Sequence, residues 1–312
     1  MHSFLKSLLI LCCTLPLWLG AAMGSSAAPG DAAIRPVAAD IKSDSASKHA
    51  QGLLWKIETA GVKPSYVFGT IHSDDARVTA LPAAVTRSLD ASSRFVMEAL
   101  IDADGLSLMA QAMFFNDGRT LEKVAGKKLY ADSVKALTAR GLPTLGVENE
   151  KPWAVMMTLS IPPPKTGEYL DLILETRATR EHKAVSGLET MQEQIAVFND
   201  LPMPDQIALL KEAVRAQQDF AKEFEALVQA YLARDLATLT EISSRHEPDE
   251  DQMYRAITDR LLTKRNIRMA ERMAPTLREG QAFIAVGAAH LPGETGLLNL
   301  IEKAGYRVTP VF

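Results

Sequence analysis

Thiols are almost absent from this chain of 312 residues. Its only two cysteines, Cys12 and Cys13, are adjacent and lie near the N-terminus, which excludes a disulfide framework for the rest of the chain. An excess of positive charge is also absent, because 34 Lys and Arg stand against 38 Asp and Glu. A formal charge of −4 gives no basic field that would hold a nucleic acid. With 47% hydrophobic and 23% charged residues, the composition is that of a globular protein.

Long apolar runs are scarce, and the one that stands out is at the N-terminus. Residues 1–28 resemble a secretory signal peptide, with Lys6 before an apolar core from Leu8 to Leu19 and a small-residue zone after it. Cleavage after Gly24 or after Ala27 fits the small-x-small rule. An uncleaved membrane anchor is the alternative, but the apolar run is short for a bilayer span of about 20 residues.

Removal of this segment changes the number of cysteines and the net charge. The mature chain has no cysteine, and 33 basic against 38 acidic residues leave a formal charge of −5. We therefore expect a periplasmic or secreted protein that has no contact with the membrane after signal cleavage. Residues 29–50 are rich in Ala, Ser, Asp and Lys without apolar periodicity, which predicts a disordered leader. The remainder, 51–312, is expected to form a single domain.

Alternating strands and helices predict an α/β (α+β) fold, with a central mixed sheet flanked by helices and a large helical middle segment. Apolar runs bounded by turn residues predict two glutamates at strand ends, Glu98 and Glu189. The predicted strands are 53–58 and 65–72, which form a hairpin, 94–99, 184–189, 282–287 and 306–311.

Between 205 and 232, apolar residues recur at helical spacing, which predicts one long amphipathic helix packed on the core. A membrane-surface helix is the alternative. Its polar face, however, mixes acids with bases instead of being rich in Lys and Arg.

Two segments far apart in the chain share one pattern, an apolar strand followed by Gly-x-x-His. The first ends in Gly69 and His72, and the second in Gly287 and His290. Glycine lets a strand bend, or another backbone approach, where the histidine must be aimed. We therefore expect both imidazoles at one end of one sheet, whereas either histidine taken alone would be interpreted as structural. His49, His182 and His246 lie in polar contexts and are expected to be solvated.

The strand-end glutamates extend this pattern to a candidate metal site. Glu98 and Glu189 could complete a first shell of two histidines and a carboxylate, which suits a divalent ion with open positions. The alternative is that each glutamate only caps the helix that follows it.

These stretches resemble the TraB/PrgY/GumN family, which includes the Tiki metalloproteases. Its two Gly-x-x-His motifs match 68–72 and 286–293, and its intervening glutamate matches the strand 95–98. Further similar stretches are 187–190, the pair Arg265-Asn266, and 305–308. The resemblance covers about residues 50 to 312.

The resemblance implies an erythromycin-esterase-like fold and a divalent metal such as Mn, Co or Zn. It implies that His72 and His290 are metal ligands, or a general base in a metal-free variant. Glu98 and Glu189 would be a ligand and a proton-transfer group, in either order.

For Arg265, the resemblance implies that it orients a carboxylate or stabilises an oxyanion; the alternative is a surface ion pair. Asp74 and Asp75 could be second-shell partners, although exposed loop aspartates are the commoner outcome. Unlike the Tiki proteins, this chain is expected to lack a membrane anchor, so their membrane-tethered substrates do not transfer to it.

A metal-dependent hydrolase acting on a peptide or small-molecule substrate is the leading hypothesis. A second is a non-catalytic protein of the same fold that sequesters haem or a peptide signal, with Tyr66 as a candidate haem ligand. A third is a metal-free esterase with a histidine base.

Overall fold

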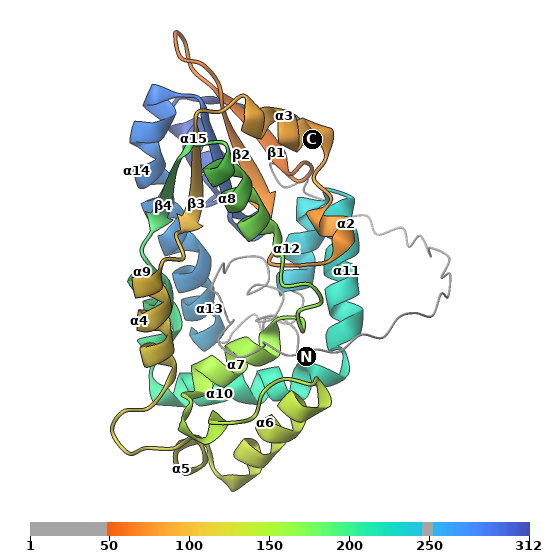
Figure 1. The fold of residues 1–312 in the computed structure, drawn as a ribbon, viewed down its shortest axis with the longest axis vertical. Coiled ribbons are helices and arrows are strands. Elements are labelled where there is room, and N and C mark those ends of the chain that lie inside the picture. Colours follow the sequence, from red (N-terminus) through yellow and green to blue (C-terminus); the bar gives the residue numbers. More distant parts are fainter. Residues whose placement is uncertain (1–48, 245–251) are drawn as a thin grey trace, which may run out of the picture.

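The computed structural model describes residues 49–244 and 252–312. The predicted signal peptide, nearly all of the predicted leader, and His246 lie outside the described residues. Figure 1 shows a sheet in the upper half and helices α5, α6, α7 and α10 in the lower half, and the arrowheads of β2 and β3 point towards those helices. The predicted mixed sheet flanked by helices is confirmed.

All six strands belong to one sheet, in the order β4-β3-β5-β2-β1-β6. The four strands β4, β3, β5 and β2 are mutually parallel, and β1 runs antiparallel to both β2 and β6. The carboxyl ends of the four parallel strands therefore meet at one edge of the sheet. The bounds are β1 Leu54–Glu58, β2 Ser65–Thr70, β3 Arg94–Ala99, β4 Ala184–Glu189, β5 Ala282–Gly287 and β6 Arg307–Pro310.

The strands form where apolar residues alternate or run together. Strand β5 is buried along its whole length, as expected for a strand in the middle of a parallel sheet with both faces covered. The turn between α14 and β5 contains Gly280, with φ of 72°. A Cβ there would lie 2.3 Å from the Lys63 carbonyl oxygen, so glycine is needed both for the backbone conformation and for the close approach.

Most helices lie between β3 and β5 in the sequence. Helix α8 packs on β3 and β4, and α14 packs on β4 and α15. The helices are α2 Ala76–Thr79, α3 Ala83–Asp90, α4 Ala103–Met113, α5 Leu121–Ala125, α6 Lys127–Ala139, α7 Pro152–Ser160, α8 Leu170–Arg180, α9 Met191–Asn199, α10 Met203–Arg215, α11 Phe220–Leu232, α12 Leu236–Ser244, α13 Gln252–Thr258, α14 Lys264–Glu279 and α15 Leu297–Lys303. No helix in the described ranges is both long and apolar enough to cross a bilayer.

The prediction of one helix over 205–232 is wrong. The chain forms α10 and α11, which are separated by the 3₁₀ turn Ala216–Gln218 and by Asp219. Apolar residues keep helical spacing on both sides of the break, so periodicity alone cannot reveal it. The core-packing interpretation holds, because Leu210, Phe220 and Leu227 are buried.

The two Gly-x-x-His segments touch each other in the fold. Strands β2 and β5 are neighbours, with Thr70 opposite Gly287. A Cβ on Gly69 would lie 2.7 Å from Leu291 Cδ1 and 3.2 Å from the Ala288 Cα. The first motif needs glycine because Ala288 of the second motif, and Leu291 just after it, pack directly on it.

We predict that Gly69→Ala destabilises the protein by about 1–3 kcal/mol, as overpacking of a close-packed core does. Urea denaturation gives the free energy of unfolding. Leu291→Ala removes the nearest obstructing atom. The double variant Gly69→Ala/Leu291→Ala should therefore lose less stability than the sum of the losses in the two single variants. Additive costs would show that Gly69 and Leu291 are not in contact.

Candidate active site

Four predicted site residues lie at the carboxyl ends of four adjacent strands. Glu189 ends β4, Glu98 is the last residue but one of β3, His290 follows β5 in the 3₁₀ turn Ala288–His290, and His72 follows β2. The connection that leaves β3 runs to the neighbouring β4, whereas the one that leaves β5 crosses to β6 at the far edge. The two connections thus leave neighbouring strands in opposite directions. In open α/β sheets, ligands bind in the crevice at such a point.

Glu98 is fully buried and has a contact for each carboxylate oxygen. Its Oε1 accepts the Gly287 N–H at 2.6 Å, and its Oε2 accepts from Arg265 Nη2 at 2.6 Å. Burial raises the pKa of Glu98 to about 7, because the opposing charge of Arg265 compensates only part of the lost hydration. In the absence of a bound cation, this carboxyl group can therefore exchange a proton near neutral pH.

Glu189 is buried as well but has the opposite electrostatic outcome. Burial acts to raise the pKa of Glu189, but the charge and hydrogen bonds of Arg265, together with the hydrogen bond from Arg268, outweigh it, so the net shift is downwards. Arg265 donates to Glu189 Oε2 from Nε at 2.9 Å and from Nη2 at 2.7 Å, and Arg268 also donates to this carboxylate. The same arginine, Arg265, thus lowers the pKa of Glu189, whereas burial prevails at Glu98 and raises its pKa.

Arg265 lies between the two carboxylates and is 1% exposed. The alternative that it makes a surface ion pair is therefore wrong. It follows the π-helical turn Asp259–Thr263 at the start of α14, a local widening that is frequent at functional sites. The geometry favours the carboxylate-orienting role, and the role itself stays a prediction.

Asn266 fixes the orientation of His290. The Asn266 amide nitrogen donates to the Thr295 carbonyl at 2.9 Å, so its Oδ1 faces His290 Nδ1 at 2.6 Å. An amide oxygen only accepts, so His290 carries its proton on Nδ1. Its Nε2 lies 3.7 Å from Glu98 Oε1.

His72 belongs to a second group of side chains at the same edge. Its ring stacks on Tyr169, with centroids 4.2 Å apart, and its Nδ1 lies 3.6 Å from Asp171 Oδ2. The other Asp171 oxygen accepts from Thr70 Oγ1 at 2.6 Å. Sequence reasoning missed Tyr169 and Asp171, since they come from the start of α8, about a hundred residues further on.

The expectation that Asp74 and Asp75 are exposed is wrong. Asp74 Oδ2 accepts the N–H groups of Lys165, Thr166 and Gly167 at 2.5–3.1 Å. Asp75 is held by Arg77, whose hydrogen bonds keep the Asp75 pKa far below its usual value. The Asp74 bonds fasten the segment that leads into Tyr169 and α8 to the residues that follow His72.

Two other histidines were expected to be solvated. His182 is exposed, as expected. For His49 the expectation is wrong, because its ring packs edge-on against Trp55 and lies 3.3 Å from a Glu302 oxygen.

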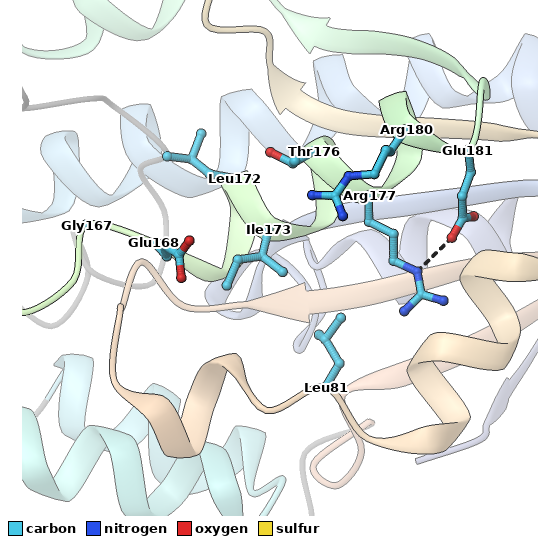
Figure 2. A pocket seen from close by; sticks show the side chains of 9 residues that line it. All are labelled: Leu81, Gly167, Glu168, Leu172, Ile173, Thr176, Arg177, Arg180 and Glu181. Atoms are coloured by element: carbon cyan, nitrogen blue, oxygen red, sulfur yellow. Dashed lines mark hydrogen bonds and ion pairs between the residues drawn. The ribbon is translucent and has the colours of Figure 1, made fainter.

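Two clefts lie on this part of the surface. One, of about 380 Å³, opens beside Glu189 and is also lined by Asp102 and Gly187. The other, of about 720 Å³, lies over the outer face of α8 (Figure 2), where Ile173 and Leu81 face the opening and Arg177 pairs with Glu181. The first cleft lies beside the end of β4, whereas the carboxylates of Glu98 and Glu189 are buried beneath the surface.

Residues 53–310 match the TraB/PrgY/gumN family. The chain belongs to this family. Similar curated proteins are metalloprotease TIKI2 of Danio rerio, 26% identical over 84% of this chain and 61% of that protein, and metalloprotease TIKI1 of Homo sapiens, 24% identical over 95% and 67%. This chain thus spans about three fifths of the length of the fish relative. No protein of solved structure gives a significant match.

The curated relatives named above are metalloproteases. The carboxylate oxygens and imidazole nitrogens of the site are of the types that bind a divalent cation, and pairs of them have suitable spacing. Two atoms that bind one ion at about 2.0–2.2 Å lie no more than about 4.4 Å apart, and Glu98 Oε1 and His290 Nε2 meet this limit. No group of three or more candidate ligands converges among the described residues, so the set His72, His290 and Glu98 stays a prediction.

We predict that the stability of the metal-free protein falls as pH rises from about 4.5 to 7. The unfolded chain loses the Glu98 proton near the ordinary value, whereas the folded chain retains it up to a pKa of about 7. The folded state therefore binds more protons in this window, and the slope is at most about 1.4 kcal/mol per pH unit for one group.

Glu150 provides a matched control, because burial also raises its pKa to about 7, with Glu148 adding to the effect. Denaturation between pH 5 and 8 should give a shallower slope for Glu98→Gln and, independently, for Glu150→Gln. A wild-type slope in Glu98→Gln would mean that Glu98 is ionised throughout this range.

Proposed function

We propose that this protein is an exported, metal-dependent hydrolase that cleaves peptides. The observation that carries the proposal is the Glu98–His290 pair, which lies at the reversal of the sheet with a carboxylate oxygen and an imidazole nitrogen 3.7 Å apart. The names of the relatives, metalloproteases, support the same chemistry. The alternative of ligand sequestration has less support, because Tyr66 pairs with Phe283 near the start of β2 and lines a different cleft.

Glu98 and His290 would hold the ion, with His72 as the further ligand that the sequence predicts. When bound, a divalent ion lowers the pKa of its water to about 7 and polarises the scissile carbonyl. Imidazole and carboxylate donors are compatible with Mn, Co or Zn.

The remaining residues act on these ligands. Asn266 keeps the His290 proton on Nδ1, as the outer-shell partner of a metal-binding histidine does. Arg265 holds Glu98 and Glu189 at fixed positions, and Glu189 keeps the arginine charge balanced. Of the two glutamates, Glu98 would be the ligand and would then be ionised, because a bound cation favours the charged carboxylate, whereas Glu189 anchors the arginine.

We expect chelator treatment to abolish peptide hydrolysis and reloading with Mn²⁺, Co²⁺ or Zn²⁺ to restore it. His290→Ala should lower kcat/KM at least about a hundredfold, because the ligand is lost. His182→Ala is the matched control, since His182 is exposed and outside the site; it should retain wild-type turnover. A peptide library serves as substrate.

Peptide turnover that ignores both the chelator and the reloading would contradict the metal, and would favour the metal-free esterase hypothesis if it still required His72. A Soret band upon addition of haemin, with no peptide turnover, would favour the sequestering hypothesis.

Export is a separate prediction. Expression of the full gene product in a Gram-negative host should yield mature protein in the periplasm, with an N-terminus at residue 25 or 28 by Edman sequencing. An intact N-terminus in the membrane fraction would instead support the uncleaved anchor.

A further inference from the structure

His72 and Asp171 direct two ligand-type atoms into one small space. The Nδ1 of His72 and the Oδ2 of Asp171 lie 3.6 Å apart. Both side chains are more than nine-tenths buried, at 7% and 6% exposure. Neither atom has a hydrogen-bond partner within the part of the chain that the structure describes.

This separation is too long for a hydrogen bond. It is, however, within the limit of about 4.4 Å for two atoms that share one divalent ion at about 2.0–2.2 Å. A buried acceptor without a partner costs about 1–3 kcal/mol, so the arrangement is more stable when something fills the space. A cation bonded to both atoms satisfies both.

Charge distinguishes this pair from the neighbouring glutamates. Glu98 and Glu189 are compensated by Arg265 and Arg268. Among the described residues, no lysine or arginine pairs with Asp171; its ion-pair contact is the imidazole of His72. The negative charge at the end of β2 therefore has no lysine or arginine partner among the described residues, and an external cation can compensate it.

The surroundings hold both groups in place. Thr70 Oγ1 donates to the other oxygen of Asp171 at 2.6 Å, and the Tyr169 ring lies parallel to that of His72, with an interplanar angle of 8°. The Leu170 N–H donates to the Ser73 carbonyl at 3.1 Å, which joins the start of α8 to the residue after His72. Contacts of this kind orient metal ligands in other proteins.

We propose that His72 and Asp171 together bind a divalent cation at the carboxyl end of β2. Asp171 is then a ligand that none of the sequence motifs contains. The inference deepens the proposed function, on which it rests for the role of His72. One imidazole and one carboxylate suit Mn²⁺ or Zn²⁺ and leave the remaining positions to water or substrate.

Equilibrium dialysis of the purified protein against Mn²⁺, and separately Zn²⁺, tests this. Asp171→Asn retains size and the Thr70 contact but loses the charge, and should weaken ion affinity at least tenfold with little change in the Tm of the metal-free protein. Thr70→Val, which frees Asp171 to rotate, should weaken it about 10- to 100-fold. Asp75→Asn is the matched control, because Asp75 is equally buried but already paired with Arg77.

A spectroscopic readout identifies the ligand atom directly. In protein labelled with ¹⁵N-histidine, Zn²⁺ should shift the ring resonance that His72→Ala removes, and Asp171→Asn should abolish that shift at the same Zn²⁺ concentration. A wild-type shift in Asp171→Asn would overturn the inference.

The same titration on Glu98→Gln separates the two proposals. Weakened affinity in Asp171→Asn supports the inference, whatever Glu98→Gln does. Unchanged affinity in Asp171→Asn with loss in Glu98→Gln overturns the inference and leaves the proposed metal-dependent function intact. Absence of Mn²⁺ and Zn²⁺ binding by the wild type at millimolar concentration overturns both.

Discussion

One buried guanidinium organises the carboxyl edge of the sheet. Arg265 binds the carboxylates at the ends of β3 and β4 and so attaches α14 to two neighbouring strands. Removing one partner of such a buried pair leaves an uncompensated charge and typically costs about 3–5 kcal/mol. Arg265 thus helps to hold both Glu98 and Glu189, and the next residue of the same helix, Asn266, contacts His290.

That arrangement also determines where negative charge remains. Arg265 and Arg268 balance Glu189 and part of the charge of Glu98, whose second oxygen accepts the Gly287 N–H. Asp171, by contrast, has a hydroxyl group on one oxygen and an imidazole near the other. The edge is therefore divided into a part neutralised by the protein's own cations and a part that is not, and the two parts follow adjacent strands.

Local signals were sufficient for the strands and for the residues that end them. Glu98, Glu189, His72 and His290 lie at the ends of apolar runs, which locate the strands, although β2 ends at Thr70 and not at His72 as predicted. Their shared edge could be anticipated because parallel strands align their carboxyl ends. The role of Gly69 was predictable in kind, since a close approach was expected, although its neighbour Leu291 was not.

Residues that act through tertiary contact gave no such signal. Tyr169 and Asp171 lie at the start of α8, and nothing in their sequence places them against His72. Asp74 resembles an exposed turn residue until the three N–H groups of 165–167 are brought to it by the fold. Similarly, the break at Asp219 preserves apolar spacing on both sides, so only packing reveals two helices in place of one.

The repeated motif acquires a more specific meaning from these contacts. Each histidine follows one of two neighbouring strands, and each places a ring nitrogen 3.6–3.7 Å from a carboxylate oxygen supplied by a different element, α8 for His72 and β3 for His290. In each histidine–carboxylate pair, only the histidine belongs to the repeated sequence motif, because the motif lies in the strand and the turn after it. The carboxylate halves come from elements with no relation to each other, so Asp171 and Glu98 could be assigned matching positions only after the fold had brought them to the same edge.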